Sequence, residues 1–171
     1  MLRRPLLLAV LLVAVGGCGT NAEPPQALDT WQIDAVDQSG VFGTITVERG
    51  ALIRLPPGSR VADRNPGATR GLLVFVTYQP DRASDSGFGA FDWDARGIAA
   101  GVPGIAGLDS GANWPVDGTL PTRLPGSDRF IGGWMVIPVT EADLRQPITL
   151  LYVPIISDEP EPIAEIVVHA P

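Results

Sequence analysis

The residues best suited to chemistry in this 171-residue chain are acidic, and two of them stand close together in the stretch DWDARG, residues 92–97. Carboxylates at alternate positions are how a calcium-binding loop begins. Here Arg96 occupies the position of the third ligand, and Pro103 stands where a bidentate glutamate belongs. The stretch therefore predicts a hairpin turn that follows a tryptophan-bearing strand. Asp92 and Asp94 stay open as a looser cation or ligand-binding site.

Two Asp-Ser-Gly tripeptides, residues 85–87 and 109–111, resemble the motif that supplies the paired carboxylates of aspartic proteases. That family places aliphatic residues before the aspartate and Ser or Thr after the glycine. Ser84 precedes the first tripeptide here, and Ala112 follows the second. Asp, Ser and Gly are also the common residues of turns, so both tripeptides are predicted to be turns.

His169 is the single histidine of the chain and lies two residues from its end. A terminal strand rarely supplies a shielded general base, and the sequence has no Gly-x-Ser-x-Gly stretch to provide a nucleophile. One histidine and one cysteine cannot form a zinc site within a monomer. We expect no catalytic residue, no metal site and no cofactor, and we expect His169 to be an exposed residue at a strand end.

The four tryptophans divide by their surroundings in the sequence. Trp31, Trp93 and Trp134 lie in strand-like runs and are predicted to belong to the core. Trp114 lies in a long loop, residues 97–128, and such loops are often functional. Trp114 either pins this loop to the domain or, if exposed, is the best single candidate for a binding contact.

Cys18 is the only cysteine, and it ends an N-terminal segment with a distinctive pattern. A basic start with Arg3 and Arg4 leads into an apolar run over residues 6–15, which predicts a secretory signal peptide that is helical in the precursor. The ending VGGC, residues 15–18, resembles the lipobox of bacterial lipoproteins. That resemblance implies cleavage before Cys18 and transfer of a diacylglycerol to its sulfur. The adjacent arginines leave export by the twin-arginine route open.

The predicted organisation is a signal peptide over residues 1–17, a lipidated N-terminus and tether over 18–29, and one domain over 30–171. The mature chain carries ten arginines, no lysine and nineteen acids, for a net charge of −9. Such a charge repels nucleic acid and anionic lipid, so we expect no nucleic-acid partner. With one cysteine no internal disulfide can form, and the core must supply the stability.

Short apolar runs separated by glycine and proline predict strands in the domain. The runs cover residues 31–35, 41–48, 51–55, 72–79, 130–139, 148–153 and 163–169, with a turn at Arg49-Gly50. About seven strands together with 17 prolines and 20 glycines predict an all-β fold, an antiparallel immunoglobulin-like β-sandwich. Residues 56–70 are expected to form a loop, and Thr140 is predicted to cap one helical turn over 141–146.

The C-terminal third supports the same fold through a family resemblance. The stretch GGWMVIPVTEADLRQPITLLYVP, residues 132–154, resembles a segment of the telokin-like, immunoglobulin-type domains of Gram-positive lipoproteins and immunoprotective extracellular proteins. LLVFVTY, residues 72–78, resembles the strand that opens the middle section of that family. The resemblance extends roughly over residues 32–168. It implies a sandwich and brings no catalytic residues.

We therefore expect a lipid-anchored domain on the extracytoplasmic face of the cell membrane, with a binding or structural role and no enzymatic activity. Its expected partners are membrane lipid, through Cys18, and an envelope protein. Two alternatives stay open. One is a hydrolase of cell-envelope material that uses carboxylates such as Asp92, Asp94 and Asp109. The other is a carrier of a small apolar ligand, held between the sheets.

Overall fold

The computed structural model describes residues 29–96, 118, 120–121, 123–124, 128–154, 156 and 161–171, with the side chains of Arg60 and Arg64 left aside. Its elements are β1 (Thr30–Asp37), β2 (Gly40–Arg54), α1 (Arg60–Arg64), β3 (Arg70–Pro80), the 3-10 helix η1 (Ala90–Asp92), β4 (Trp93–Arg96), β5 (Ile131–Val139), the 3-10 helix η2 (Asp143–Arg145), β6 (Ile148–Tyr152) and β7 (Ala164–Val168). The predicted all-β class is confirmed. The predicted signal peptide, its lipidation site and the tether lie outside the described residues, apart from Asp29.

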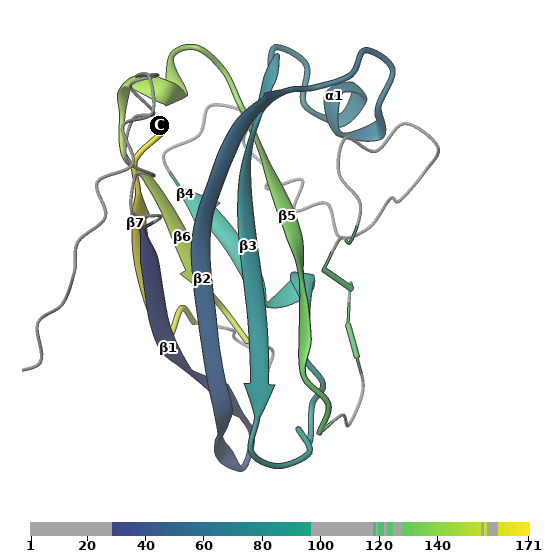
Figure 1. The fold of residues 1–171 in the computed structure, drawn as a ribbon, viewed down its shortest axis with the longest axis vertical. Helices are drawn as coiled ribbons and strands as arrows, with labels where there is room; N and C mark the ends of the chain where they lie inside the picture. The colour runs from purple at the N-terminus through teal and green to yellow at the C-terminus, as the bar shows by residue number, and fades with distance from the viewer. Residues whose placement is uncertain are drawn as a thin grey trace, which may run out of the picture.

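The strands form two antiparallel sheets, shown as separate layers in Figure 1. The four-stranded sheet has the order β1-β2-β3-β5, and the three-stranded sheet has the order β4-β6-β7. Each strand in both sheets pairs antiparallel with its neighbours. The long central strands β2 and β3 carry most of the pairing in the larger sheet.

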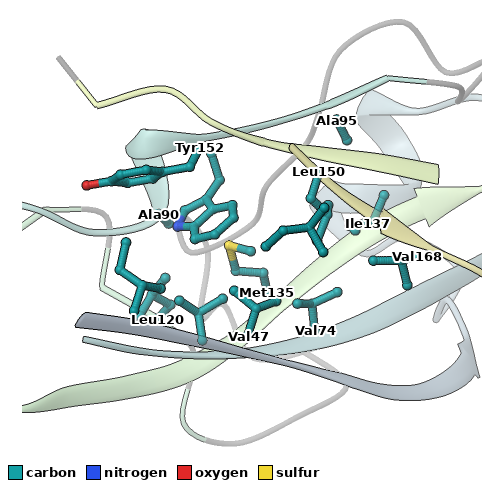
Figure 2. Close-up of a cluster of buried hydrophobic side chains, with 14 of the residues drawn as sticks. Val47, Val74, Ala90, Ala95, Leu120, Met135, Ile137, Leu150, Tyr152 and Val168 are labelled. Atoms are coloured by element: carbon teal, nitrogen blue, oxygen red, sulfur yellow. The ribbon is translucent and has the colours of Figure 1, made fainter. Parts of the chain in front are cut away.

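A single buried cluster draws side chains from both sheets. In β1 the alternation is plain, because Trp31, Ile33 and Ala35 belong to or pack against this cluster while the residues between them are exposed. In Figure 2, Leu150 of the three-stranded sheet points toward Val74 and Met135 of the four-stranded sheet. Burial of this apolar surface is the main source of stability in a chain without an internal disulfide.

A second, smaller apolar cluster lies on the opposite face of the four-stranded sheet, beneath α1. Leu73 and Val136 are cross-strand partners that point away from the main core. Val61 of α1 packs against them, with Trp134 half-buried at the edge. Ser59 caps α1 by accepting a hydrogen bond from the backbone N–H of Ala62 at 3.3 Å. The segment 56–70 was predicted to be a loop without a helix, so α1 corrects that prediction.

Two predicted turns are wrong because the strands continue through them. β2 is one strand from Gly40 to Arg54, and the Arg49-Gly50 step is an irregularity in its pairing with β3 rather than a turn. A Cβ at Gly50 would lie 2.6 Å from Cζ3 of Trp134, so the missing side chain lets that ring lie against the strand. The predicted hairpin turn after Trp93 is also wrong for residues 94–96, which belong to β4 and pair with β6.

The predicted helical turn after β5 is confirmed in a shorter form, as η2, with Ala142 rather than Thr140 at its N-cap position. Thr140 Oγ1 accepts a hydrogen bond from the Asp143 N–H at 3.2 Å, and Asp143 Oδ2 accepts one from the Thr140 N–H at 2.7 Å. Each side chain thus satisfies the backbone of the other at the start of the turn. Asp143 is buried as a consequence.

Candidate functional site

Asp92, one of the two acids singled out in the sequence, ends η1 and is only 2% exposed. Its Oδ2 accepts a hydrogen bond from the backbone N–H of Gly89 at 2.8 Å. Its carbonyl oxygen accepts another from the N–H of Val153 at 2.7 Å, which extends the pairing of β4 with β6 by one residue. A buried backbone N–H must find an acceptor, and the Asp92 carboxylate supplies it for Gly89.

A hydrogen-bonded pair of aromatic side chains lies beside this turn in the main core. Trp93 Nε1 donates to the hydroxyl of Tyr78 at 2.9 Å, and that hydroxyl donates to the carbonyl of Gly89 at 3.3 Å. Burial first, and then the negative charge of Asp92, raise the pKa of Tyr78 well above its ordinary value. Tyr78 is therefore neutral at physiological pH, and its hydroxyl fixes η1 to the core.

Asp94, the second acid, points to the other face of the three-stranded sheet. Its neighbours Trp93 and Ala95 are buried in the core cluster, and successive strand residues alternate between faces. Asp94 is half-buried, and its Oδ1 accepts a hydrogen bond from the N–H of Ala95 at 2.6 Å. The structure does not bring Asp92 and Asp94 together, because Asp92 faces Tyr78 in the core while Asp94 faces away from it.

The proposed third carboxylate of the hydrolase alternative, Asp109, lies outside the described residues, as does Pro103. Within the part of the chain that the structure describes, no three side chains of His, Cys, Asp or Glu gather in a way that could hold a metal ion. Asp92 and Asp94 therefore do not form a shared cation site from described residues alone.

A polar cluster of the described fold centres on Asp37, which was not among the residues singled out from the sequence. The Asp37 side chain is fully buried at the end of β1, and Arg82 contacts both of its oxygens. The carboxylate also accepts the backbone N–H groups of Ser39 and Asp85, each at 2.9 Å. The hydrogen bond from Arg82 is the main cause that lowers the pKa of Asp37 from 3.8 to about 2.

A signal for Asp37 was present in the sequence. Trp31, Ile33 and Ala35 set the inward phase of β1, and Asp37 continues it. A carboxylate on the core side of a strand requires a charged or hydrogen-bonded partner. The partner itself, Arg82, could not be found without the structure, because it lies 45 residues further along the chain.

The first Asp-Ser-Gly tripeptide forms a bend at Asp85 and Ser86 rather than the predicted turn. Asp85 makes the backbone contact to Asp37 described above, and the carbonyl of Ser86 accepts a hydrogen bond from Arg123 Nε at 2.9 Å. Gly87 has a φ of 76°, a conformation that glycine adopts without strain. The second tripeptide, residues 109–111, lies outside the described residues.

The remaining predicted residues are placed as follows. Trp93 is buried, whereas Trp31 and Trp134 are half-buried and pack on the edges of the two apolar clusters. His169 is exposed just after β7, as predicted, and its carbonyl oxygen accepts a hydrogen bond from Arg49 at 2.8 Å. Trp114 and Cys18 lie outside the described residues.

Three comparisons with known proteins, against family models, curated sequences and solved structures, find no match to this chain. In the described ranges, no helix has the length and apolar character needed to cross a membrane.

Proposed function

We propose that this chain is a lipid-anchored extracytoplasmic protein with a non-enzymatic binding or structural role at the cell envelope. The observation that carries the proposal is the N-terminal sequence itself. An apolar run over residues 6–15 ends in VGGC, and the cysteine has no second cysteine with which to form a disulfide. Two acyl chains on Cys18 would hold the protein stably on a bilayer, where one chain would bind only weakly.

We also propose that the two sheets form a β-sandwich of the immunoglobulin-like type. The shared buried cluster and the division into four and three strands support this architecture. The connectivity differs from that of an immunoglobulin constant domain, in which the third strand crosses to the smaller sheet. Here β3 stays between β2 and β5, and the fourth strand, β4, makes the crossing. The likeness is therefore one of layers and strand number.

The non-enzymatic role is supported by what the buried acids do. Asp37, Asp92 and Asp143 each accept hydrogen bonds from the backbone of a neighbouring turn. These carboxylates therefore serve as hydrogen-bond acceptors for backbone N–H groups in the loops of the fold. A hydrolase needs two carboxylates that converge in a concave site, whereas Asp92 in η1 faces the core and Asp94 in β4 faces away from it.

We propose that the predicted loop over residues 97–128, with Trp114, carries the contact to an envelope protein. Its C-terminal part is not a free loop, because Leu120 is buried in the main core and its N–H donates to the carbonyl of Trp134 at 3.0 Å, so the proposed contact lies in the part of the loop that includes Trp114. The length of this loop and its tryptophan motivate the proposal. A Trp114→Ala variant is expected to lose partner capture, while Phe130→Ala serves as the matched control. Phe130 is an aromatic residue that is 65% exposed just before β5, and its removal is expected to leave capture unchanged.

The experiment that tests the anchor and the role together is metabolic labelling with a fatty-acid analogue, followed by cross-linking and recovery of the protein from membranes. The wild-type chain is expected to take up label and to bring cross-linked neighbours with it. A Cys18→Ser variant is expected to take up none and to leave the membrane fraction. Label on the Cys18→Ser variant, or none on the wild type, would contradict the proposal.

A further inference from the structure

One edge of the four-stranded sheet ends in β1, which has no strand on its outer side among the described residues. The sheet has the order β1-β2-β3-β5, and Figure 1 shows β1 at its edge. At the opposite edge a further segment pairs with β5. The N–H of Leu120 donates to the carbonyl of Trp134 at 3.0 Å, and the N–H of Trp134 donates to the carbonyl of Gly118 at 2.9 Å. The outer side of β1 is therefore the open edge of this sheet.

The pairing of β1 with β2 fixes which backbone groups of β1 face the open edge. The N–H of Arg49 in β2 donates to the carbonyl of Asp29 at 3.0 Å, one step before the first paired residue of β1. In an antiparallel pair, residues that bond to the partner strand alternate with residues that do not. Counting from Asp29, the odd-numbered residues bond to β2. The N–H and C=O groups of Gln32 and Asp34 therefore point away from β2, toward the open edge.

The far end of this edge agrees with the alternation and is closed. The N–H of Val36, the next even-numbered residue, donates to the hydroxyl of Tyr152 at 3.2 Å instead of to β2. Tyr152 belongs to the smaller sheet, so its hydroxyl occupies the edge at this point. No described residue bonds to the outward backbone groups of Gln32 or Asp34. These two residues keep the hydrogen-bonding capacity of an unpaired strand.

The side chains of β1 show that this edge is open to solvent. Trp31 and Ile33 pack against the main core yet are only half-buried, whereas their cross-strand partners Val47 and Ile45 are fully buried. The remaining exposure of Trp31 and Ile33 therefore lies at the open edge, and a strand added there would cover it. Residues 30–35 contain no Lys, Arg or Pro, the residues that commonly protect an edge strand from further pairing.

We propose that a second copy of this chain adds its own β1 to the open edge, antiparallel, with Ile33 opposite Ile33 of the other copy. This inference goes beyond the proposed function and does not depend on the anchor. In this register Gln32 of each chain lies opposite Asp34 of the other, so that an amide faces a carboxylate and their outward backbone groups bond to each other. Trp31 lies opposite Ala35, so that a large side chain meets a small one.

Neighbouring registers are less favourable. A two-fold axis at Asp34 would place two carboxylates directly opposite each other, which destabilises a sheet. An axis at Gln32 would pair Asp34 with Thr30, which already makes an interaction within its own chain. The register centred on Ile33 avoids both problems. Residues 31–35, WQIDA, are thus complementary to the same stretch read in reverse, and a symmetric contact between two copies requires this property.

The test is disulfide cross-linking of the chain from residue 18 with Cys18→Ser, which retains every described residue. Single cysteines are introduced as Gln32→Cys, Ile33→Cys and Asp34→Cys. Val167→Cys, at a position that is 48% exposed in β7, is the control for chance collisions. Two copies of residue 33 would form a non-hydrogen-bonded pair with Cα atoms about 4.5 Å apart, which a disulfide spans. Two copies of residue 32, or of residue 34, would lie about 8 Å apart, which is too far.

We expect Ile33→Cys to form a covalent dimer at least about threefold faster than each of the other three variants. Ile33 is less exposed than Val167, so accessibility alone would give the reverse order. Unfolding midpoints of the reduced proteins establish that the variants are folded. A rate for Ile33→Cys no higher than that for Val167→Cys would overturn the proposal. Fastest linking at Gln32→Cys or Asp34→Cys would overturn the register.

Substitutions at the exposed Gln32 give a second reading that leaves the core-facing side chains in place. Gln32→Arg puts a cation opposite Asp34 of the other copy, and we expect the dissociation constant from sedimentation equilibrium to fall about threefold or more. Gln32→Asp puts a carboxylate there and should raise the constant by a similar factor. Gln38→Arg, in the exposed turn after β1, makes the same change in charge and should leave it unaltered. Equal shifts for Gln32→Arg and Gln38→Arg, or only monomer for both the wild type and Gln32→Arg, would overturn the proposal.

Discussion

Arg82 donates two hydrogen bonds to the carboxylate of Asp37, at 2.8 Å to Oδ2 and 2.6 Å to Oδ1. Asp37 ends β1 with a fully buried side chain, while Arg82 follows β3 and is 36% exposed. A bidentate pair of this kind fixes orientation as well as distance. It therefore holds the β1–β2 hairpin against the segment that leads from β3 to η1. The backbone N–H groups of Ser39 and Asp85 also donate to the Asp37 carboxylate.

This pair predicts a specific dependence of stability on pH. The folded state lowers the pKa of Asp37 from 3.8 to about 2, so folding is favoured by the ionised form. The contribution is complete above about pH 4, declines between pH 4 and 2, and is lost below about pH 2. A shift of this size corresponds to at most about 2.4 kcal/mol, and we expect about 1–2 kcal/mol because Arg82 is partly exposed to solvent.

The measurement is the free energy of unfolding of the wild type and of Asp37→Asn between pH 2 and 7. The difference between the two proteins should be constant from pH 7 to about pH 4 and should shrink as the pH falls from about 4 to 2. Taking the difference removes the contribution of the other carboxylates, which titrate in both proteins. A difference that stays constant over this range would contradict the role of the Asp37 charge.

The two tyrosines of the chain are both expected to resist ionisation. Burial raises the pKa of Tyr78 well above 10.0, and burial also raises the pKa of Tyr152. The folded protein should therefore show little tyrosinate absorbance between about pH 9 and 11, whereas the unfolded chain should titrate both groups near pH 10. Because the unfolded state loses these protons first, the contribution of the two tyrosines to stability should be constant below about pH 10 and fall above it. A tyrosine titrating near pH 10 in the folded protein would contradict this.

Removal of the Tyr78 hydroxyl should be costly, because it leaves a buried donor unpaired. In Tyr78→Phe the Nε1–H of Trp93 loses its acceptor, and we expect a loss of about 1–3 kcal/mol in the free energy of unfolding. Tyr152→Phe is the matched control, since its hydroxyl contacts Val36 at a partly buried edge of β1, at 3.2 Å from the Val36 nitrogen. Tyr152→Phe should lose less free energy of unfolding than Tyr78→Phe. Equal losses in the free energy of unfolding, measured in urea, would contradict a larger contribution from the Tyr78–Trp93 hydrogen bond.

Truncation of the two acids of DWDARG should destabilise the protein to different extents. Asp92→Ala leaves the buried N–H of Gly89 without its acceptor, and we expect a loss of about 2–3 kcal/mol. Asp94→Ala removes a half-buried side chain that points away from the core, and the expected loss is under about 1 kcal/mol. The measurement is the free energy of unfolding of both variants in urea. A larger loss for Asp94→Ala would contradict the placement of the two carboxylates.

A methyl group at Gly50 should disturb the small cluster under α1. Its Cβ would lie 2.6 Å from Cζ3 of Trp134 and 3.0 Å from Cβ of Leu73, so the indole must move. We expect Gly50→Ala to lose about 1–3 kcal/mol. Ala51→Ser, at the exposed neighbouring position, is the control and should stay within about 0.5 kcal/mol of wild type. Unchanged stability and unchanged tryptophan fluorescence in Gly50→Ala would contradict the packing.

The strands were the most predictable part of the molecule. The run LLVFVTYQ, residues 72–79, lies within β3, because a continuous stretch of apolar and β-branched residues suits a strand buried in the middle of a sheet. The pairing of Thr140 with Asp143 was predictable for a similar reason, since it depends on residues three positions apart. The helix α1 was not, because five residues are too few to show a helical period.

The placement of the acids could not be predicted from local sequence. A strand over DWDARG would put Asp92 and Asp94 on the same face, since they are two residues apart. The short helix η1 ends at Asp92 and breaks that alternation, so one carboxylate enters the core and the other does not. Only the packing of η1 against Tyr78 decides this, and Tyr78 lies 14 positions before Asp92.

The central claim is that Cys18 carries the anchor, and the most direct measurement is the mass of the N-terminal peptide of the protein purified from membranes. We predict a mature chain that begins at Cys18, lacks residues 1–17 and carries the added mass of a diacylglycerol on its sulfur. A chain that retains residues 1–17, or one that is cleaved elsewhere and carries no lipid, would contradict the account.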